Sequence, residues 1–191
     1  MTRRLLIAGV GNIFLGDDGF GVEVARRLAD VELPDWAHVV DYGIRGMHLA
    51  YDLANGYEAM ILVDATPRGG APGTIYVIEP DLTAGIRDTA DGEGTAEPDP
   101  ASYPLFNAHG MQPDVVFSML AMLDAGAREV LVVGCEPASV DYGIGLSAPV
   151  ADAVDEAVRV VLDLVADATA SGEHHLVAKV KEGSHVPRNS G

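Results

Sequence analysis

The chain has 191 residues, of which 48% are apolar and 21% are charged. This length and composition predict one globular domain with a substantial core. No apolar run reaches the roughly 18 residues of a membrane span, and the formal net charge of −17 repels polyanions, so we expect neither a membrane nor a nucleic-acid partner. The first residues lack the cleavage site of a signal peptide, which predicts a cytoplasmic protein.

The first third of the chain alternates strand and helix patterns. Leu5–Val10 is a short unbroken apolar run, which is typical of a strand buried on both faces. Gly21–Leu28 has apolar residues at helical spacing and predicts the first helix. The same order then repeats, with a strand at His38–Asp41, a helix at Met47–Ala54 and a strand at Ala59–Val63.

The remaining elements predict a mixed sheet. The connection at 67–73 is too short for a helical crossover, so we expect Thr74–Ile78 to pair antiparallel with a neighbour or to form an edge of the sheet. The acidic stretch from about 80 to 105 predicts a mobile loop. Val130–Val133 is a further buried strand, and Ser147 is predicted to cap a long final helix.

Together these elements predict a three-layer α/β/α fold around a twisted, mostly parallel mixed sheet of about five strands. We expect one domain over residues 1–171 and a poorly ordered tail over 172–191. Ligands of such folds bind at the carboxyl ends of the strands. Asp18 follows the first strand and Asp64 ends the third, so both carboxylates are expected at this edge.

The loop after the first strand is glycine-rich but does not match a nucleotide-binding loop. Phe14 stands where a dinucleotide fingerprint requires glycine. Gly11 and Gly16 align with a phosphate loop, yet the lysine and hydroxyl positions hold Asp17 and Asp18. Two carboxylates repel phosphate and attract a metal ion. The alternative is that this acidic pair only forms a turn and caps the following helix.

Asp64 and His109 are the other candidate ligands. A carboxylate at the end of a buried strand is either satisfied by neighbouring backbone N–H groups or faces a ligand. His109 precedes a helix that is predicted to start at Pro113 and Asp114. The helix dipole there favours the neutral imidazole that binds metal, although a loop histidine can also be inert. With Asp18 they form an oxygen-rich set with open positions, suited to a divalent ion such as zinc or nickel.

Six short segments follow one another between about residues 4 and 165: Gly9–Asn12, Gly16–Gly21, Val63–Ala65, Pro72–Thr74, the His109 segment and Gly134–Pro137. Together they resemble the [NiFe]-hydrogenase maturation endopeptidase family. The resemblance implies that Asp18, Asp64 and His109 coordinate nickel. It also implies the reaction, in which a short C-terminal extension is cut from a hydrogenase large-subunit precursor after nickel insertion.

The resemblance further implies that the substrate supplies the nickel, for which zinc or cadmium is expected to substitute in vitro. It separates no catalytic residue from the metal ligands. We expect the chain to act as a monomer on the precursor. One alternative is a non-catalytic nickel-sensing or chaperone module with the same ligands; another is a phosphate-handling enzyme on a related fold. Tyr42 stands where many relatives have glycine, which predicts a reshaped loop.

Overall fold

The computed structural model describes residues 4–80, 129–170 and 176. The predicted strands and helices in these ranges are all present, with bounds that differ by a few residues. The elements are β1 (Leu5–Val10), the short 3₁₀ helix η1 (Gly16–Gly19), α1 (Phe20–Ala29), β2 (Ala37–Gly43), α2 (Gly46–Ala54), β3 (Ala59–Ala65), β4 (Ile75–Ile78), β5 (Glu129–Cys135) and α5 (Ala148–Ala170).

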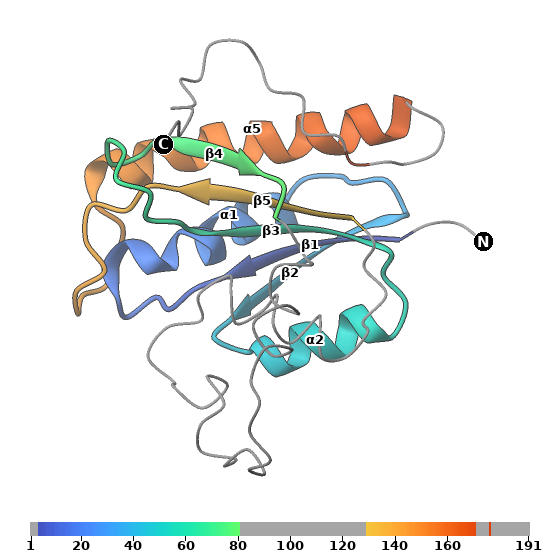
Figure 1. Ribbon diagram of the computed structural model, residues 1–191, viewed down its shortest axis with the longest axis horizontal. Helices are drawn as coiled ribbons and strands as arrows, with labels where there is room; N and C mark the ends of the chain where they lie inside the picture. The colour runs from blue at the N-terminus through green and yellow to red at the C-terminus, as the bar shows by residue number, and fades with distance from the viewer. Residues whose placement is uncertain (1–3, 81–128, 171–175, 177–191) are drawn as a thin grey trace, which may run out of the picture.

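The five strands form one mixed sheet in the order β2-β1-β3-β5-β4. β1, β2, β3 and β5 are parallel, and β4 runs antiparallel to β5 at the edge, as the short connection predicts (Figure 1). β3 and β5 extend two residues beyond the predicted strands, because Asp64 pairs with Gly134 and Ala65 with Cys135. Asp64 therefore belongs to the ladder of β3 rather than to the loop after it.

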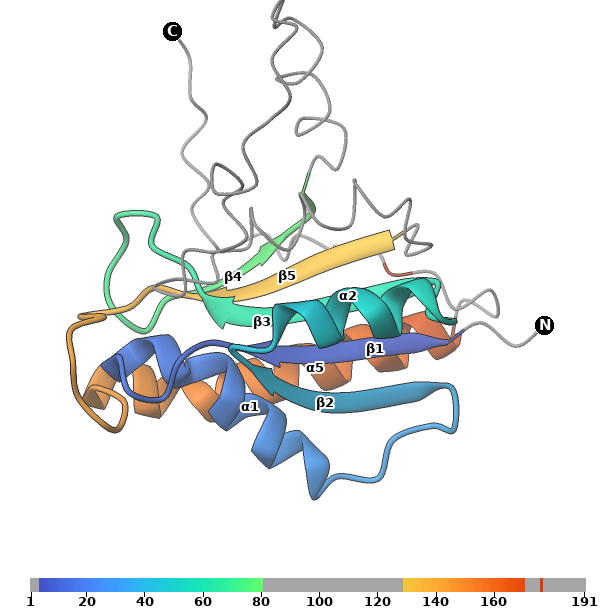
Figure 2. The same ribbon diagram turned by 90° about the horizontal axis from the view of Figure 1, so that it is seen from below.

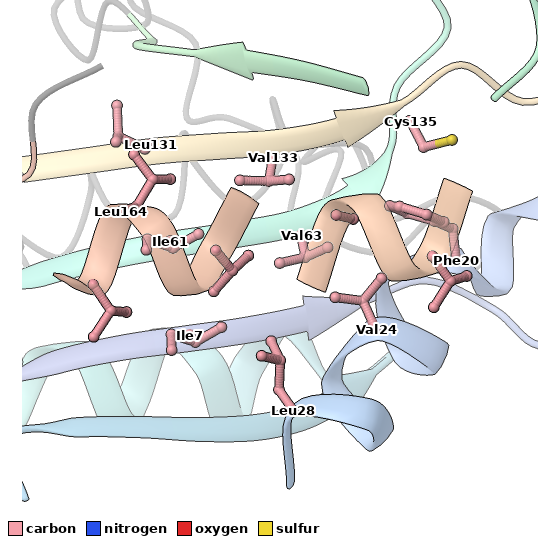
Figure 3. Packing of buried hydrophobic residues seen from close by; sticks show 14 of the residues in the cluster. Ile7, Phe20, Val24, Leu28, Ile61, Val63, Leu131, Val133, Cys135 and Leu164 are labelled. Atoms are coloured by element: carbon pink, nitrogen blue, oxygen red, sulfur yellow. The ribbon is translucent and has the colours of Figure 1, made fainter. Parts of the chain in front are cut away.

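Helices cover both faces of the sheet, so the predicted three layers are confirmed (Figure 2). Alternate strand residues point to opposite faces. On one face, Ile7 and Val63 pack with residues of α1 and α5 in a large apolar cluster (Figure 3). On the other, Leu6 and Leu62 pack with residues of α2. Burial of the strands on both faces explains their unbroken apolar runs.

Several predictions fall on residues outside the described ranges. They include His109, nearly all of the predicted acidic loop at 80–105 and the tail at 172–191. In the tail, the structure describes Leu176, which packs against the large apolar cluster and donates its backbone N–H to Glu129 at 2.9 Å. The domain division at residue 171 stays a prediction. Among the described helices, none is long and apolar enough to cross a membrane.

Candidate active site

Close packing between α1 and the strand ends positions the candidate site. A Cβ atom on Gly21 would lie 2.1 Å from the carbonyl oxygen of Val63 and 2.3 Å from that of Val10. A Cβ on Gly9 would lie 2.3 Å from the carbonyl oxygen of Gly21. Glycine at these positions lets the start of α1 sit directly against the carboxyl ends of β1 and β3. The chain just before α1 is thereby brought to the end of β3.

The loop from β1 to η1 folds back on itself at Gly11. This residue has a φ of +132°, and a Cβ there would lie 1.8 Å from the carbonyl oxygen of Asp18. The backbone N–H of Asn12 donates to Oδ2 of Asp18 at 2.7 Å. The glycines of the opening motif thus serve close backbone approach rather than phosphate binding. Their effect is to hold η1, which carries Asp18, in contact with β3.

Asp18 lies close enough to Asp64 for its charge to perturb the ionisation of Asp64. Asp64 is 1% exposed, and among the described residues its one hydrogen bond is the N–H of Ala65, at 2.8 Å to Oδ1. Burial raises the pKa of Asp64 well above its ordinary value, and the negative charge of Asp18 raises it further. Burial also raises the pKa of Asp18, against the opposing effect of the Asn12 N–H. A cation bound between the two carboxylates would remove this unfavourable electrostatics.

Asp17 has a different role from its neighbour. It is 1% exposed, and its carboxylate accepts hydrogen bonds from the N–H groups of Ala138 (2.8 Å), Ser139 (3.2 Å) and Ser147 (2.6 Å) and from the Ser147 hydroxyl (2.9 Å). Burial alone would raise the pKa of Asp17, but these hydrogen bonds outweigh it and lower the pKa. Asp17 is therefore an anchor between two loops, and both of its carboxylate oxygens are engaged in hydrogen bonds.

The two interpretations of the acidic pair each fit in part. The turn is present as η1, but the expected side-chain cap of α1 is wrong, because Gly19 is the N-cap residue and no side chain bonds there. The hydroxyl of Ser147, which lies directly before α5, is directed to Asp17.

Of the predicted ligands, the structure brings Asp18 and Asp64 together, and His109 lies outside its described part. The described residues contain no group of three or more His, Cys, Asp or Glu side chains that could hold a metal.

Comparisons with known proteins identify relatives of this chain. A family model described as hydrogenase maturation protease (HycI) matches residues 22–87. A hydrogenase 2 maturation protease of Escherichia coli is 31% identical over 162 residues, which cover 83% of this chain and 88% of that protein. The chain belongs to the hydrogenase maturation protease family.

Solved structures support the same relationship. A hydrogenase maturating endopeptidase from Escherichia coli superposes with a TM-score of 0.62 at 28% identity, over 88% of this chain and 94% of that one. A hydrogenase 2 maturation peptidase from a Thaumarchaeota archaeon gives 0.61 at 29% identity, over 90% and 99%. Membership of this family makes the chain a hydrolase of the endopeptidase type. It decides against both the non-catalytic module and the phosphate-handling enzyme.

Glu136 is a buried residue of this maturation protease whose role the sequence did not reveal. Its carboxylate accepts the N–H groups of Arg68 (2.8 Å) and Gly69 (3.1 Å) and the hydroxyl of Tyr76 (2.9 Å). Burial raises its pKa, but the hydrogen bonds, that of the Arg68 N–H foremost, outweigh burial and leave the pKa lowered. Glu136 thus fixes the β3–β4 connection to the end of β5. The sequence does contain a signal for this role, since Glu136 is an ionisable residue directly after an apolar strand.

Cys135 and Tyr42 complete the surroundings of the site. Cys135 is fully buried, and burial, assisted by the charge of Asp17, raises the pKa of its thiol to about 12. Cys135 is therefore a small core residue, since a thiolate nucleophile is disfavoured at neutral pH. Tyr42 is also buried and donates its hydroxyl to Asp52 at 2.6 Å, which ties the end of β2 to α2.

Proposed function

We propose that this maturation protease removes the C-terminal extension of a [NiFe]-hydrogenase large-subunit precursor after nickel has been inserted. The observation that carries the proposal is the pair Asp18 and Asp64 at the carboxyl edge of the sheet. Two mutually repelling carboxylates with few donors form an arrangement suited to receiving a cation. Relatives named as hydrogenase maturation proteases support the same reaction class.

The hydrogen bonds of the two carboxylates prepare them for this task. Asn12 donates to Oδ2 of Asp18, and Ala65 donates to Oδ1 of Asp64. Each carboxylate is thereby oriented through one oxygen by backbone of its own loop or strand. The described residues donate no hydrogen bond to the second oxygen of either side chain, which leaves it available to the ion or to a water molecule.

Nickel in this proposal is part of the substrate. Asp18, Asp64 and His109 hold the ion that the precursor carries, and zinc or cadmium would replace it in vitro. The positive charge then lies where negative charge develops on the tetrahedral intermediate of peptide hydrolysis. A carboxylate oxygen not engaged with the ion accepts the proton of the attacking water. The ion reports that loading of the precursor is complete, because cleavage requires it.

The partner and setting follow from the reaction. The precursor is the one macromolecular partner that the proposal requires, and a single copy of this chain carries all three ligands. We place the reaction in the cytoplasm, with the chain acting as a monomer. Sedimentation of the purified protein and fractionation of cells that express it test these two statements.

Cleavage of nickel-loaded precursor tests the reaction and the ligands. We expect Asp64→Asn and His109→Ala each to reduce kcat by about 100-fold or more, as for loss of a group that stabilises the transition state, while the far-ultraviolet circular dichroism stays unchanged. Asp30→Asn and His48→Ala, at exposed positions on α1's end and α2, are matched controls and should cleave normally. Normal cleavage by the His109 variant, or binding of precursor by the wild type without shortening it, would refute the proposal.

A further inference from the structure

A group of large apolar side chains is exposed beside the candidate site. Phe14 is 60% exposed, Tyr142 86% and Ile144 82%, and Ile13 and Val140 are also exposed. We call these five residues the apolar rim. They come from the loop after β1 and from the loop between β5 and α5, which lie at the same end of the sheet (Figure 1). Exposed apolar groups that gather in this way are typical of interaction sites.

The two loops of the rim are held together by backbone hydrogen bonds. Gly16 N–H donates to Gly143 O, and Gly143 N–H donates to Phe14 O, each at 3.0 Å. Leu15 and Gly143 form a parallel β-bridge. The buried carboxylate of Asp17 binds three further backbone N–H groups of the second loop. The rim is therefore presented on a fixed base, so a partner that binds it does not have to order the loops first.

The rim is continuous with the site through a short stretch of chain. Phe14 and Asp18 are four residues apart in the loop whose fold is fixed by the Asn12–Asp18 hydrogen bond. The segments 11–19 and 136–147 contain no lysine or arginine, whereas Asp141, which lies between two residues of the rim, is acidic and exposed. A complementary partner is thus apolar at its centre and basic at its margins.

We propose that the apolar rim docks the large-subunit precursor itself, through an apolar segment flanked by lysine or arginine next to the scissile bond. The inference rests on the proposed function and adds the surface that recognises the substrate. A polypeptide whose nickel reaches Asp18 comes close to the rim, because Phe14 lies four residues from Asp18 in the same folded loop. A second copy of this chain is disfavoured as the occupant, because each copy carries a net charge of −17.

The test combines direct binding with steady-state cleavage of nickel-loaded precursor. In the double variant Phe14→Ser, Tyr142→Ser we expect Kd and KM to rise about tenfold or more, equivalent to about 1.4 kcal/mol or more. We expect kcat at saturating precursor to stay within about twofold, since no metal ligand is changed. Tyr51→Ser is the matched control, because Tyr51 is 69% exposed on α2 and lies outside the rim. Its Kd and KM should equal those of the wild type.

The outcomes separate this inference from the proposed function. If the double variant has the same Kd and KM as the wild type and cleaves normally, the docking role is overturned and the proposed reaction still stands. Binding that depends on the rim, without cleavage by the wild type, would support docking and refute the reaction. Self-association of the wild type that the double variant loses would assign the rim to a second copy and overturn the inference.

Discussion

Substitution by asparagine should have different effects on stability at the neighbouring residues Asp17 and Asp18. Asp17→Asn removes the charge from a buried carboxylate that accepts four hydrogen bonds. Oδ2 accepts three of them and Oδ1 accepts the N–H of Ser147. Because an amide has only one acceptor oxygen, its best orientation keeps the three and turns an NH₂ group towards the Ser147 N–H.

The expected loss of stability follows from the number of hydrogen bonds that are lost or weakened. One buried donor loses its acceptor, which costs about 1–3 kcal/mol, and three charge-assisted bonds become weaker neutral ones. We therefore expect Asp17→Asn to lower the free energy of unfolding by about 2–4 kcal/mol. For a domain of this size, that corresponds to a fall of about 5–15 °C in Tm.

Asp18→Asn is the matched comparison. Asp18 accepts one hydrogen bond, from the N–H of Asn12, and the amide oxygen of asparagine can keep it. Loss of the charge also removes the repulsion that raises the pKa of Asp64. We expect a stability equal to or slightly above that of the wild type, together with loss of precursor cleavage.

Urea denaturation of both variants at pH 7, followed by circular dichroism, provides the measurement. The anchoring role of Asp17 would be refuted by a wild-type unfolding midpoint for Asp17→Asn. It would be equally refuted if Asp18→Asn were destabilised as much, since the loss would then reflect any charge removed from this loop. The m-values of the three proteins should agree, so that the midpoints report stability alone.

Two further predictions concern packing and pH. Gly21→Ala should lower the free energy of unfolding by about 1–3 kcal/mol or more, because the added Cβ would overlap the carbonyl oxygens of Val63 and Val10. Gly143→Ala is the control and should unfold at the wild-type midpoint, because Gly143 has open space around it. Equal thermal midpoints for the two variants would contradict this prediction. The pKa of Glu136 is lowered in the folded state, so its ionised carboxylate stabilises the fold above the ordinary pKa of 4.5. This contribution is lost progressively as the pH falls below 4.5 and through the lowered pKa. The stability gap between wild type and Glu136→Gln should therefore narrow below about pH 4.5; a constant gap down to acid pH would show that the charge is not involved.

The order of strands and helices was determined by the sequence alone. Leu5–Val10 and Ala59–Val63 are apolar without a break because both faces of each strand are covered, and this pattern is visible in the sequence itself. The antiparallel direction of β4 followed from the length of the connection at 67–73, which admits no crossover helix. The same alternation of strands and helices predicted that Asp18 and Asp64 lie together at the edge of the sheet formed by the carboxyl ends of the strands.

Only the tertiary structure decided which carboxylates are structural. Asp17 and Asp18 have the same chemistry and adjacent positions, but the donors that engage Asp17 lie 121 to 130 residues further along the chain. Glu136 is satisfied by groups 60 to 68 residues away. The free energy of a buried charge depends on the donors that the fold places around it. Local sequence therefore identifies a candidate ligand, and long-range contacts decide whether its oxygens are free to bind an ion.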